Sequence, residues 1–247
     1  MPIRILRTPV EEKLPAPSHA TIGVFDGVHR GHQRLIGLMT EMAHAEKRLA
    51  AVMTFDPHPG AVLGQRTVPA LSTVEERAAL LDEIGVDLLV VLRFSESVAQ
   101  TPAIEFVDML CQDLRMAELW MGPDFALGRE REGDVEFLRQ VGQQRGFSVE
   151  VVPPLEWRGE VVSSSRVRAA LAEGDLEEAN GCLGRPYQVS GQVTRDASLE
   201  RGAIAELTIE VPASRLLPTA GVYGCRASIA ARDLGHVVVD VPPTSPG

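Results

Sequence analysis

Short apolar runs alternate with amphipathic stretches over most of this 247-residue chain, and this alternation limits the folds that it can adopt. Apolar periodicity predicts strands at residues 20–25, 50–55, 86–92, 119–122 and 147–152, with helices at 31–49, 73–84, 102–114 and 133–145 and another opening within 162–168. Ser72 is the expected N-cap of the helix at 73–84. Repeated strand–helix units are typical of an α/β fold with a doubly wound, Rossmann-like parallel sheet. Ligands bind such sheets at the carboxyl ends of the strands, so we expect the chemistry in the loops after Phe25, Phe55, Gly122 and Val162.

The pattern changes near residue 186, after which short strands are predicted. They cover residues 188–194, 204–211, 222–230 and 236–241. We therefore expect an α/β domain at 1–185 and a small β domain at 186–247. About 60 residues make a marginal core, so the second domain is expected to lean on its neighbour or on another copy of the chain.

Charge and cysteine content exclude several classes of protein. The net charge is -10, and residues 186–247 contribute only -1 of it, with five Arg against six acidic residues. This balance argues against a nucleic-acid or membrane-surface binder and favours a small-molecule ligand. Three scattered Cys residues predict neither a disulfide framework nor a zinc site, and neither a signal peptide nor a long apolar run is found, so we expect a soluble cytoplasmic protein.

The segment Phe25-Asp-Gly-Val-His-Arg-Gly-His32 joins the first predicted strand to the first helix. Helix starts normally favour acidic side chains, but this one carries His29, Arg30 and His32. Such an arrangement indicates a site for an external anion, with both imidazoles as donors and Gly31 allowing a phosphate to approach the backbone. Neither the Walker lysine motif nor GxGxxG is present, so a P-loop and a dinucleotide-binding loop are disfavoured.

Two other interpretations of the histidine pair stay open. A metal site would need a third ligand from His58 or Asp56, and the spacing is not that of a zinc-binding helix, so we assign no metal ligand. The segment could also be a purely structural loop.

A second group of anion-binding side chains opens the helix near residue 164. Ser163, Ser164 and Ser165 are followed by Arg166 and Arg168. One serine is expected to cap the helix, while the others and one of the arginines supply hydroxyl, N–H and guanidinium donors.

Together these segments resemble the nucleotidyltransferase superfamily, which activates substrates with ATP and releases pyrophosphate. Within it the chain resembles the prokaryotic FAD synthetase family, usually a bifunctional riboflavin kinase and FMN adenylyltransferase. The motifs that carry the resemblance run in order from Thr21 to Tyr187: Thr21-Ile-Gly-Val-Phe-Asp-Gly-Val-His-Arg-Gly-His-Gln33, Thr54-Phe-Asp-Pro-His-Pro59, Gly122-Pro-Asp-Phe-Ala-Leu-Gly128 and Leu183-Gly-Arg-Pro-Tyr187.

The resemblance implies transfer of AMP from ATP to FMN, giving FAD and magnesium pyrophosphate, with ATP, Mg²⁺ and FMN as the small molecules bound. It assigns catalysis to His29, His32 and Arg168, and ATP binding to Gly23, Phe25, Gly31, Ser164 and Ser165. It assigns flavin binding to Phe55, Pro57, His58, Asp124 and Phe125. Phe55 and Phe125 are equally compatible with ordinary core packing, and Asp124 with a turn.

The C-terminal segment departs from the family. Its kinase barrel normally carries a Pro-Thr-Ala-Asn motif, whereas the corresponding stretch here reads Arg201-Gly-Ala-Ile-Ala-Glu-Leu-Thr208, with an echo only at Leu216-Leu-Pro-Thr-Ala-Gly-Val-Tyr223. We therefore expect no riboflavin kinase activity and interpret residues 186–247 as a small β-barrel-like remnant that caps the flavin cleft or mediates homo-oligomerisation. The alternatives are a nucleotidyltransferase with another phosphate-bearing acceptor and a non-catalytic flavin- or nucleotide-binding protein.

Overall fold

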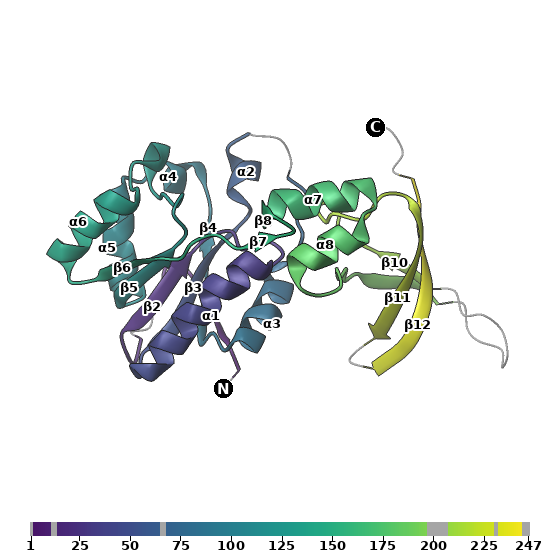
Figure 1. Ribbon diagram of the computed structural model, residues 1–247, viewed down its shortest axis with the longest axis horizontal. Helices are drawn as coiled ribbons and strands as arrows, with labels where there is room; N and C mark the ends of the chain where they lie inside the picture. The colour runs from purple at the N-terminus through teal and green to yellow at the C-terminus, as the bar shows by residue number, and fades with distance from the viewer. Residues whose placement is uncertain (1, 11–13, 65–67, 197–206, 230–231, 244–247) are drawn as a thin grey trace. The chain divides into compact units, whose positions relative to one another are not determined.

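The computed structural model describes residues 2–10, 14–64, 68–196, 207–229 and 232–243 (Figure 1). The chain divides into two compact units, 1–164 and 165–247. This division falls inside the serine-rich segment, and the domain boundary expected from the sequence between residues 185 and 186 stays a prediction. None of the helices in the described ranges is long and apolar enough to cross a membrane.

The first unit is built on a parallel sheet whose described strands follow the order β1-β4-β3-β2-β5-β6. The strands are β1 Arg4–Arg7, β2 Ser18–Ile22, β3 Leu49–Asp56, β4 Leu88–Arg93, β5 Met116–Met121 and β6 Ser148–Val151. This arrangement confirms the predicted α/β, Rossmann-like fold. Strand β1 was not expected, because it lies in the proline-containing lead-in and its apolar content is low.

Helices cover both faces of the sheet (Figure 1). Helices α1 (Arg30–Ala45) and α3 (Val74–Ile84) share one core, and α5 (Ala103–Asp113) and α6 (Val135–Arg145) share the other. Strand β3 contributes side chains to both cores, because successive side chains of a strand point to opposite faces of the sheet. Val52 lies in the first core and Met53 in the second. A sheet buried on both faces explains why its strands read as continuous apolar runs.

Helix α3 begins differently from the prediction. Thr73, not Ser72, is its N-cap, and it forms a capping box with Glu76. The Ser72 hydroxyl is engaged elsewhere, since it donates to Asp26 and accepts from the backbone N–H of Gly27.

Other boundaries differ by a few residues. Helix α1 ends at Ala45 rather than Leu49, because Lys47 adopts a left-handed φ of 57° in the turn that follows. Strand β2 ends at Ile22, before Phe25, whose φ of 49° is incompatible with a strand. Short elements that sequence periodicity did not indicate are α2 (Pro59–Val62), α4 (Glu96–Ala99), the 3₁₀ turn η1 (Arg129–Arg131) and the hairpin of β7 (Glu156–Trp157) and β8 (Glu160–Val161).

The second unit combines helices with antiparallel strands. Helix α7 spans Ser164–Glu173, starting with the last residue of the first unit, and α8 spans Leu176–Leu183. Strand β9 (Gln192–Asp196) pairs with β10 (Leu207–Glu210), and β11 (Gly221–Ile229) pairs with β12 (Arg232–Val241). Helix α8 was missed, although Asp175 caps it. The beginning of the strand predicted at 204–211 lies outside the described residues.

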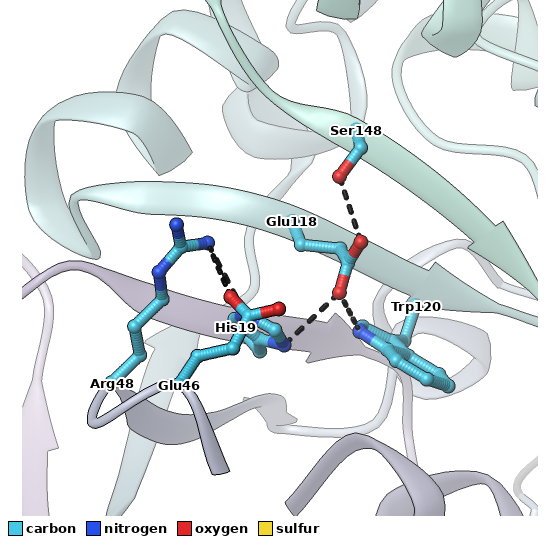
Figure 2. A network of polar contacts seen from close by, with 6 residues as sticks. All are labelled: His19, Glu46, Arg48, Glu118, Trp120 and Ser148. Carbon is cyan, nitrogen blue, oxygen red and sulfur yellow. Dashed lines mark hydrogen bonds and ion pairs between the residues drawn. The ribbon is translucent and has the colours of Figure 1, made fainter. Parts of the chain in front are cut away.

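A polar network around the buried His19 lies at the amino ends of the strands (Figure 2). The Glu118 carboxylate accepts hydrogen bonds from Trp120 Nε1 at 2.9 Å and from Ser148 Oγ at 2.7 Å. His19 is fully buried, and its Nδ1 lies 3.0 Å from Glu118 Oε2, within ion-pair range although not aligned as a hydrogen bond. Glu46 and Arg48, which pair at 3.1 Å, contact His19 from the turn after α1. The network therefore joins β2, β5 and β6 to the turn that leads into β3.

Replacing Glu118 should destabilise the protein more than replacing Glu46. Glu118→Ala would leave the Trp120 Nε1 donor without its acceptor and His19 without its buried carboxylate, for a loss of about 2 to 4 kcal/mol. Glu46 is 42% exposed, so Glu46→Ala should cost less than about 1 kcal/mol. Urea unfolding of the two variants measures the difference, and equal losses would contradict the assigned role of the Glu118 network.

Candidate active site

The site lies where the direction of strand succession reverses in the sheet. Strand β2 lies between β3 and β5, and the chain runs from β2 to β3 on one side but returns to the other side of β2 as β5. Such a switch point, at the carboxyl ends of parallel strands, is where open α/β sheets bind ligands. The loops after β2, β3 and β5 begin at this edge, and they carry the predicted segments at 23–32, 55–58 and 124–125.

His29 and His32 form a stacked pair at the start of α1. Their ring centroids are 3.5 Å apart with an interplanar angle of 20°. His29 is the N-cap residue, and its Nδ1 accepts a hydrogen bond from the backbone N–H of His32 at 3.3 Å. A neutral imidazole that accepts at Nδ1 carries its proton at Nε2, so His29 presents a donor from that nitrogen. The first turn of α1 holds no acidic side chain, as the sequence predicted.

His32 is neutral at physiological pH. Burial of the imidazole, followed by the proximity of His29, lowers the pKa of His32 well below its usual range. The residue as a whole is half-buried, but its Nδ1 is enclosed and has no hydrogen-bond partner among the described residues. The edge of the Phe25 ring packs against this imidazole, with centroids 5.1 Å apart. A buried polar atom without a partner is a feature that a bound ligand or water can explain.

Two glycines make room for the aromatic rings of this loop. A Cβ at Gly31 would lie 3.1 Å from Cε1 of His29, and one at Gly23 would lie 2.9 Å from Cζ of Phe25. Gly31 thus lets the His29 ring fold over the helix start, a role that adds to the expected approach of a phosphate.

The loop between β2 and α1 is held in a conformation that non-glycine residues avoid. Phe25 and Val28 have φ values of 49° and 40°, and the β-branched Val28 is completely buried. The buried carboxylate of Asp26 accepts hydrogen bonds from the backbone N–H groups of Leu71 and Ser72 at 2.9 to 3.0 Å. These contacts tie the loop to the segment that precedes α3.

A buried arginine of α3 also supports this loop. Arg77 Nη1 donates to the carbonyl of Val24 at 2.7 Å and to Thr54 Oγ1 at 2.6 Å, and the Thr54 hydroxyl donates to the same carbonyl at 2.9 Å. Burial lowers the pKa of Arg77, and the charge of Asp26 opposes that shift. No local sequence pattern marks Asp26, Ser72, Thr54 or Arg77 as site residues, because their contacts join segments far apart in the chain.

The serine-rich segment meets the histidine loop through Ser164. Its hydroxyl donates to the backbone carbonyl of Asp26 at 2.9 Å. Ser165 and Arg168 belong to the second unit, in which Ser165 is exposed and Arg168 half-buried. Arg166 forms an ion pair with Glu178 of α8, the neighbouring helix.

The predicted flavin-side residues lie at the carboxyl end of β3, which includes Phe55, and in the loops after β3 and β5. Phe55 packs edge-to-face on Phe94 with centroids 5.5 Å apart, and both Phe55 and Phe125 contact the α5–α6 core, so their packing role is real. Pro57 and Asp124 are exposed, and the Asp124 carbonyl accepts a hydrogen bond from Arg131.

The side chains that the alternative metal site would need as a third ligand have other contacts. His58 Nδ1 accepts from the backbone N–H of Gly60 and caps α2, and the Asp56 carboxylate lies 3.7 Å from Arg7. Among the residues that the structure describes, no group of three or more His, Cys, Asp or Glu side chains could hold a metal ion.

A further cation contact at the start of α1 was not expected. The Arg30 guanidinium lies over the Trp157 ring of the β7–β8 hairpin, 4.7 Å from its centroid, and Arg158 lies 5.7 Å from the same ring. The cation–π contact thus holds the Arg30 side chain against the β7–β8 hairpin.

The lowered pKa of His32 should make the stability of the fold sensitive to pH. Below about pH 6.5 the unfolded chain binds a proton at His32 that the folded chain excludes. The contribution of His32 to the free energy of unfolding is therefore fully present above that pH, and it decreases as the pH drops toward the pKa of His32 in the folded protein. His32→Asn should lose less unfolding free energy than the parent chain between about pH 7.5 and about pH 5.5, measured by urea unfolding. Equal losses in both proteins would contradict the burial of a neutral imidazole.

Comparison with known proteins places this geometry in a family. The family model described as FAD synthetase matches residues 11–166. A bifunctional riboflavin kinase/FMN adenylyltransferase of Pseudomonas fluorescens is 36% identical over 231 residues, covering 92% of this chain and 74% of that protein. The protein of the same description from Escherichia coli (strain K12) is 37% identical over 206 residues, covering 82% of this chain and 66% of that protein.

A solved structure is similar over nearly the whole chain. It is the crystal structure of a Streptococcus pneumoniae protein described as a macrolide-efflux protein, with a TM-score of 0.80 and 26% identity, covering 97% of this chain and 89% of that one. The chain spans about two thirds to three quarters of the length of the two bifunctional relatives. With the family model matching more than half of its residues, the chain belongs to the FAD synthetase family.

Proposed function

We propose that the protein is an FMN adenylyltransferase that transfers AMP from ATP to FMN and releases pyrophosphate. The observation that carries the proposal is the stacked His29–His32 pair at the start of α1, on a loop at the switch point of the sheet. Membership of the FAD synthetase family supports the same substrates, ATP and FMN, and the product FAD.

In the proposed reaction an oxygen of the FMN phosphate attacks the α-phosphorus of ATP. The new P–O bond joins FMN to AMP as FAD, and the bond from the α-phosphorus to the bridging oxygen breaks, releasing pyrophosphate. Transfer of this kind depends on positioning and charge stabilisation more than on a protein nucleophile.

The chain's own residues supply donors for that charge. His29 presents the Nε2 proton that its Nδ1 contact implies, and His32 is held beside it as a neutral imidazole. The N–H groups of the first turn of α1 face the same end of the helix without competition from an acidic side chain. In the proposal, Gly23, Phe25 and Gly31 shape this loop, while Ser164, Ser165 and Arg168 bind further phosphate oxygens.

Mg²⁺ belongs in this proposal as part of the substrate. ATP carries the ion in on its phosphates, and pyrophosphate carries it away. The proposed flavin side lies at the carboxyl end of β3 and in the loops after β3 and β5, the two neighbours of β2; its residues are Phe55, Pro57, His58, Asp124 and Phe125.

Riboflavin kinase activity is not part of the proposal, because the Pro-Thr-Ala-Asn motif is absent from the sequence. The partners proposed are small molecules, with neither nucleic acid nor membrane, in the cytoplasm. Association of copies through residues 186–247 stays a prediction. A second candidate is a nucleotidyltransferase with another phosphate-bearing acceptor. The missing kinase motif favours it, because a protein that does not make FMN itself is less constrained to use FMN as its acceptor.

An assay with ATP and Mg²⁺ tests both candidates. FMN should yield FAD and riboflavin should yield no FMN, with the flavins separated by chromatography. FMN formed from riboflavin would contradict the loss of kinase activity, and absence of FAD would contradict the proposed acceptor.

His32→Ala should reduce the rate of FAD formation by about 10² to 10³, the usual cost of removing one transition-state donor. FMN binding, followed by flavin fluorescence, should be retained. His44→Ala is the matched control, because His44 is an exposed histidine in the last turn of the same helix. Unchanged turnover in His32→Ala would refute the role assigned to the residue.

Substitutions of Arg166 and Arg168, the two arginines of α7, should have different effects. Arg168→Ala should raise the KM for ATP and lower kcat, by about tenfold or more in kcat/KM, because a charged donor to phosphate is lost. Arg166→Ala should lower thermal stability through its lost pair with Glu178, with kcat/KM changed much less. The opposite ranking in steady-state kinetics would reassign the phosphate contact to Arg166.

A further inference from the structure

Ser72 bridges two segments 45 residues apart. It directly precedes the N-cap of α3, yet its hydroxyl does not serve that helix. The hydroxyl donates to Asp26 Oδ1 at 3.0 Å and accepts from the backbone N–H of Gly27 at 2.8 Å, and the residue is only 4% exposed. One buried side chain thus holds both a carboxylate and a backbone donor of the loop that leads to His29.

This loop needs external support. Gly27 and Val28 both have positive φ values, 77° and 40°. This conformation is sterically strained for Val28, because its side chain is β-branched. Conformations of this kind persist where surrounding contacts determine them. Gly27 precedes His29 by two residues. A displacement of the backbone at Gly27 therefore also displaces the histidine pair.

We propose that Ser72 is a positioning residue for adenylyl transfer, which holds the loop after β2 so that His29 and His32 stack at the start of α1. This inference rests on the proposed function for its kinetic consequence, but its structural consequence can be measured without any activity. Ser72 touches neither histidine; it acts through Gly27 and Asp26.

The hydroxyl is the part of Ser72 that a substitution can isolate. The backbone N–H groups of Leu71 and Ser72 still donate to Asp26 in Ser72→Ala, so the carboxylate keeps partners. The Gly27 N–H loses its acceptor in a buried place, which is costly. Only one oxygen atom is removed, so the surrounding core keeps its packing.

The adjacent Thr73 supplies a matched control. Thr73→Ala also removes one hydroxyl, and it breaks the capping box of α3, a loss that typically lowers helix stability. Its hydroxyl bonds the backbone N–H of Glu76 rather than the histidine loop. Urea unfolding then shows how much each variant loses in stability, and steady-state kinetics show how much each loses in FAD formation.

We expect Ser72→Ala to lower kcat by about tenfold or more, since small displacements of catalytic groups carry large rate costs, and Thr73→Ala to change kcat by less than about threefold. Equal kinetic losses in the two variants, following their losses of stability, would overturn the proposal by making Ser72 merely structural. An unchanged kcat in Ser72→Ala would overturn it as well.

NMR titration of the histidine imidazoles tests the same inference independently of FAD formation. Burial lowers the pKa of His32, so loosening the loop should return that pKa toward its usual value in Ser72→Ala but not in Thr73→Ala. If the parent chain makes no FAD, the proposed function fails, and a shifted His32 titration in Ser72→Ala still supports the positioning role. A His32 titration that is identical in the parent and Ser72→Ala would refute it.

Discussion

The buried carboxylate of Asp26 is the contact on which the site depends. A charged group inside a protein is tolerated only where hydrogen bonds or opposite charges replace water. Here the Asp26 carboxylate accepts hydrogen bonds from the backbone N–H groups of Leu71 and Ser72 and from the Ser72 hydroxyl. It also interacts electrostatically with the charge of Arg77. Because Ser164 also donates to the Asp26 carbonyl, one residue organises the approach to α1 from both the α3 and the α7 segments. Together these contacts fix the conformation of the loop that leads to His29.

The proposed function places anion binding at one local site of an acidic protein. The chain carries a net charge of -10, yet the start of α1 has no acidic side chain in its first turn and combines helix N–H groups with two imidazoles. Because burial lowers the pKa of His32, the phosphate site of the proposed function acts through directed donors and the helix dipole more than through net positive charge. Arg30, the first residue of α1, has its guanidinium over the Trp157 ring.

Much of the fold followed from local patterns. Apolar runs of strand length and amphipathic helical periods identified five strands of the parallel sheet and its four long helices, because burial on both faces leaves a continuous signal in the sequence. Strand β1 escaped because it lies at the edge of the sheet and alternates in burial over four residues. Helix α8 was not predicted, because eight residues are too few to show a clear helical periodicity. Asp175 and the acidic residues after it are nevertheless normal helix-start signals.

The sequence by itself determined that His29 and His32 stand at a helix start after a buried strand, since strand, loop and helix are contiguous and their signals are local. It also determined that acidic residues are missing from that start. Only the tertiary structure decided what holds the histidines: Ser72 was expected to cap α3, and instead Thr73 caps it while Ser72 bonds Gly27 and Asp26. Two adjacent hydroxyl residues offer the same local capping signal, and the choice between them is made by a partner 45 residues away that a local pattern does not contain.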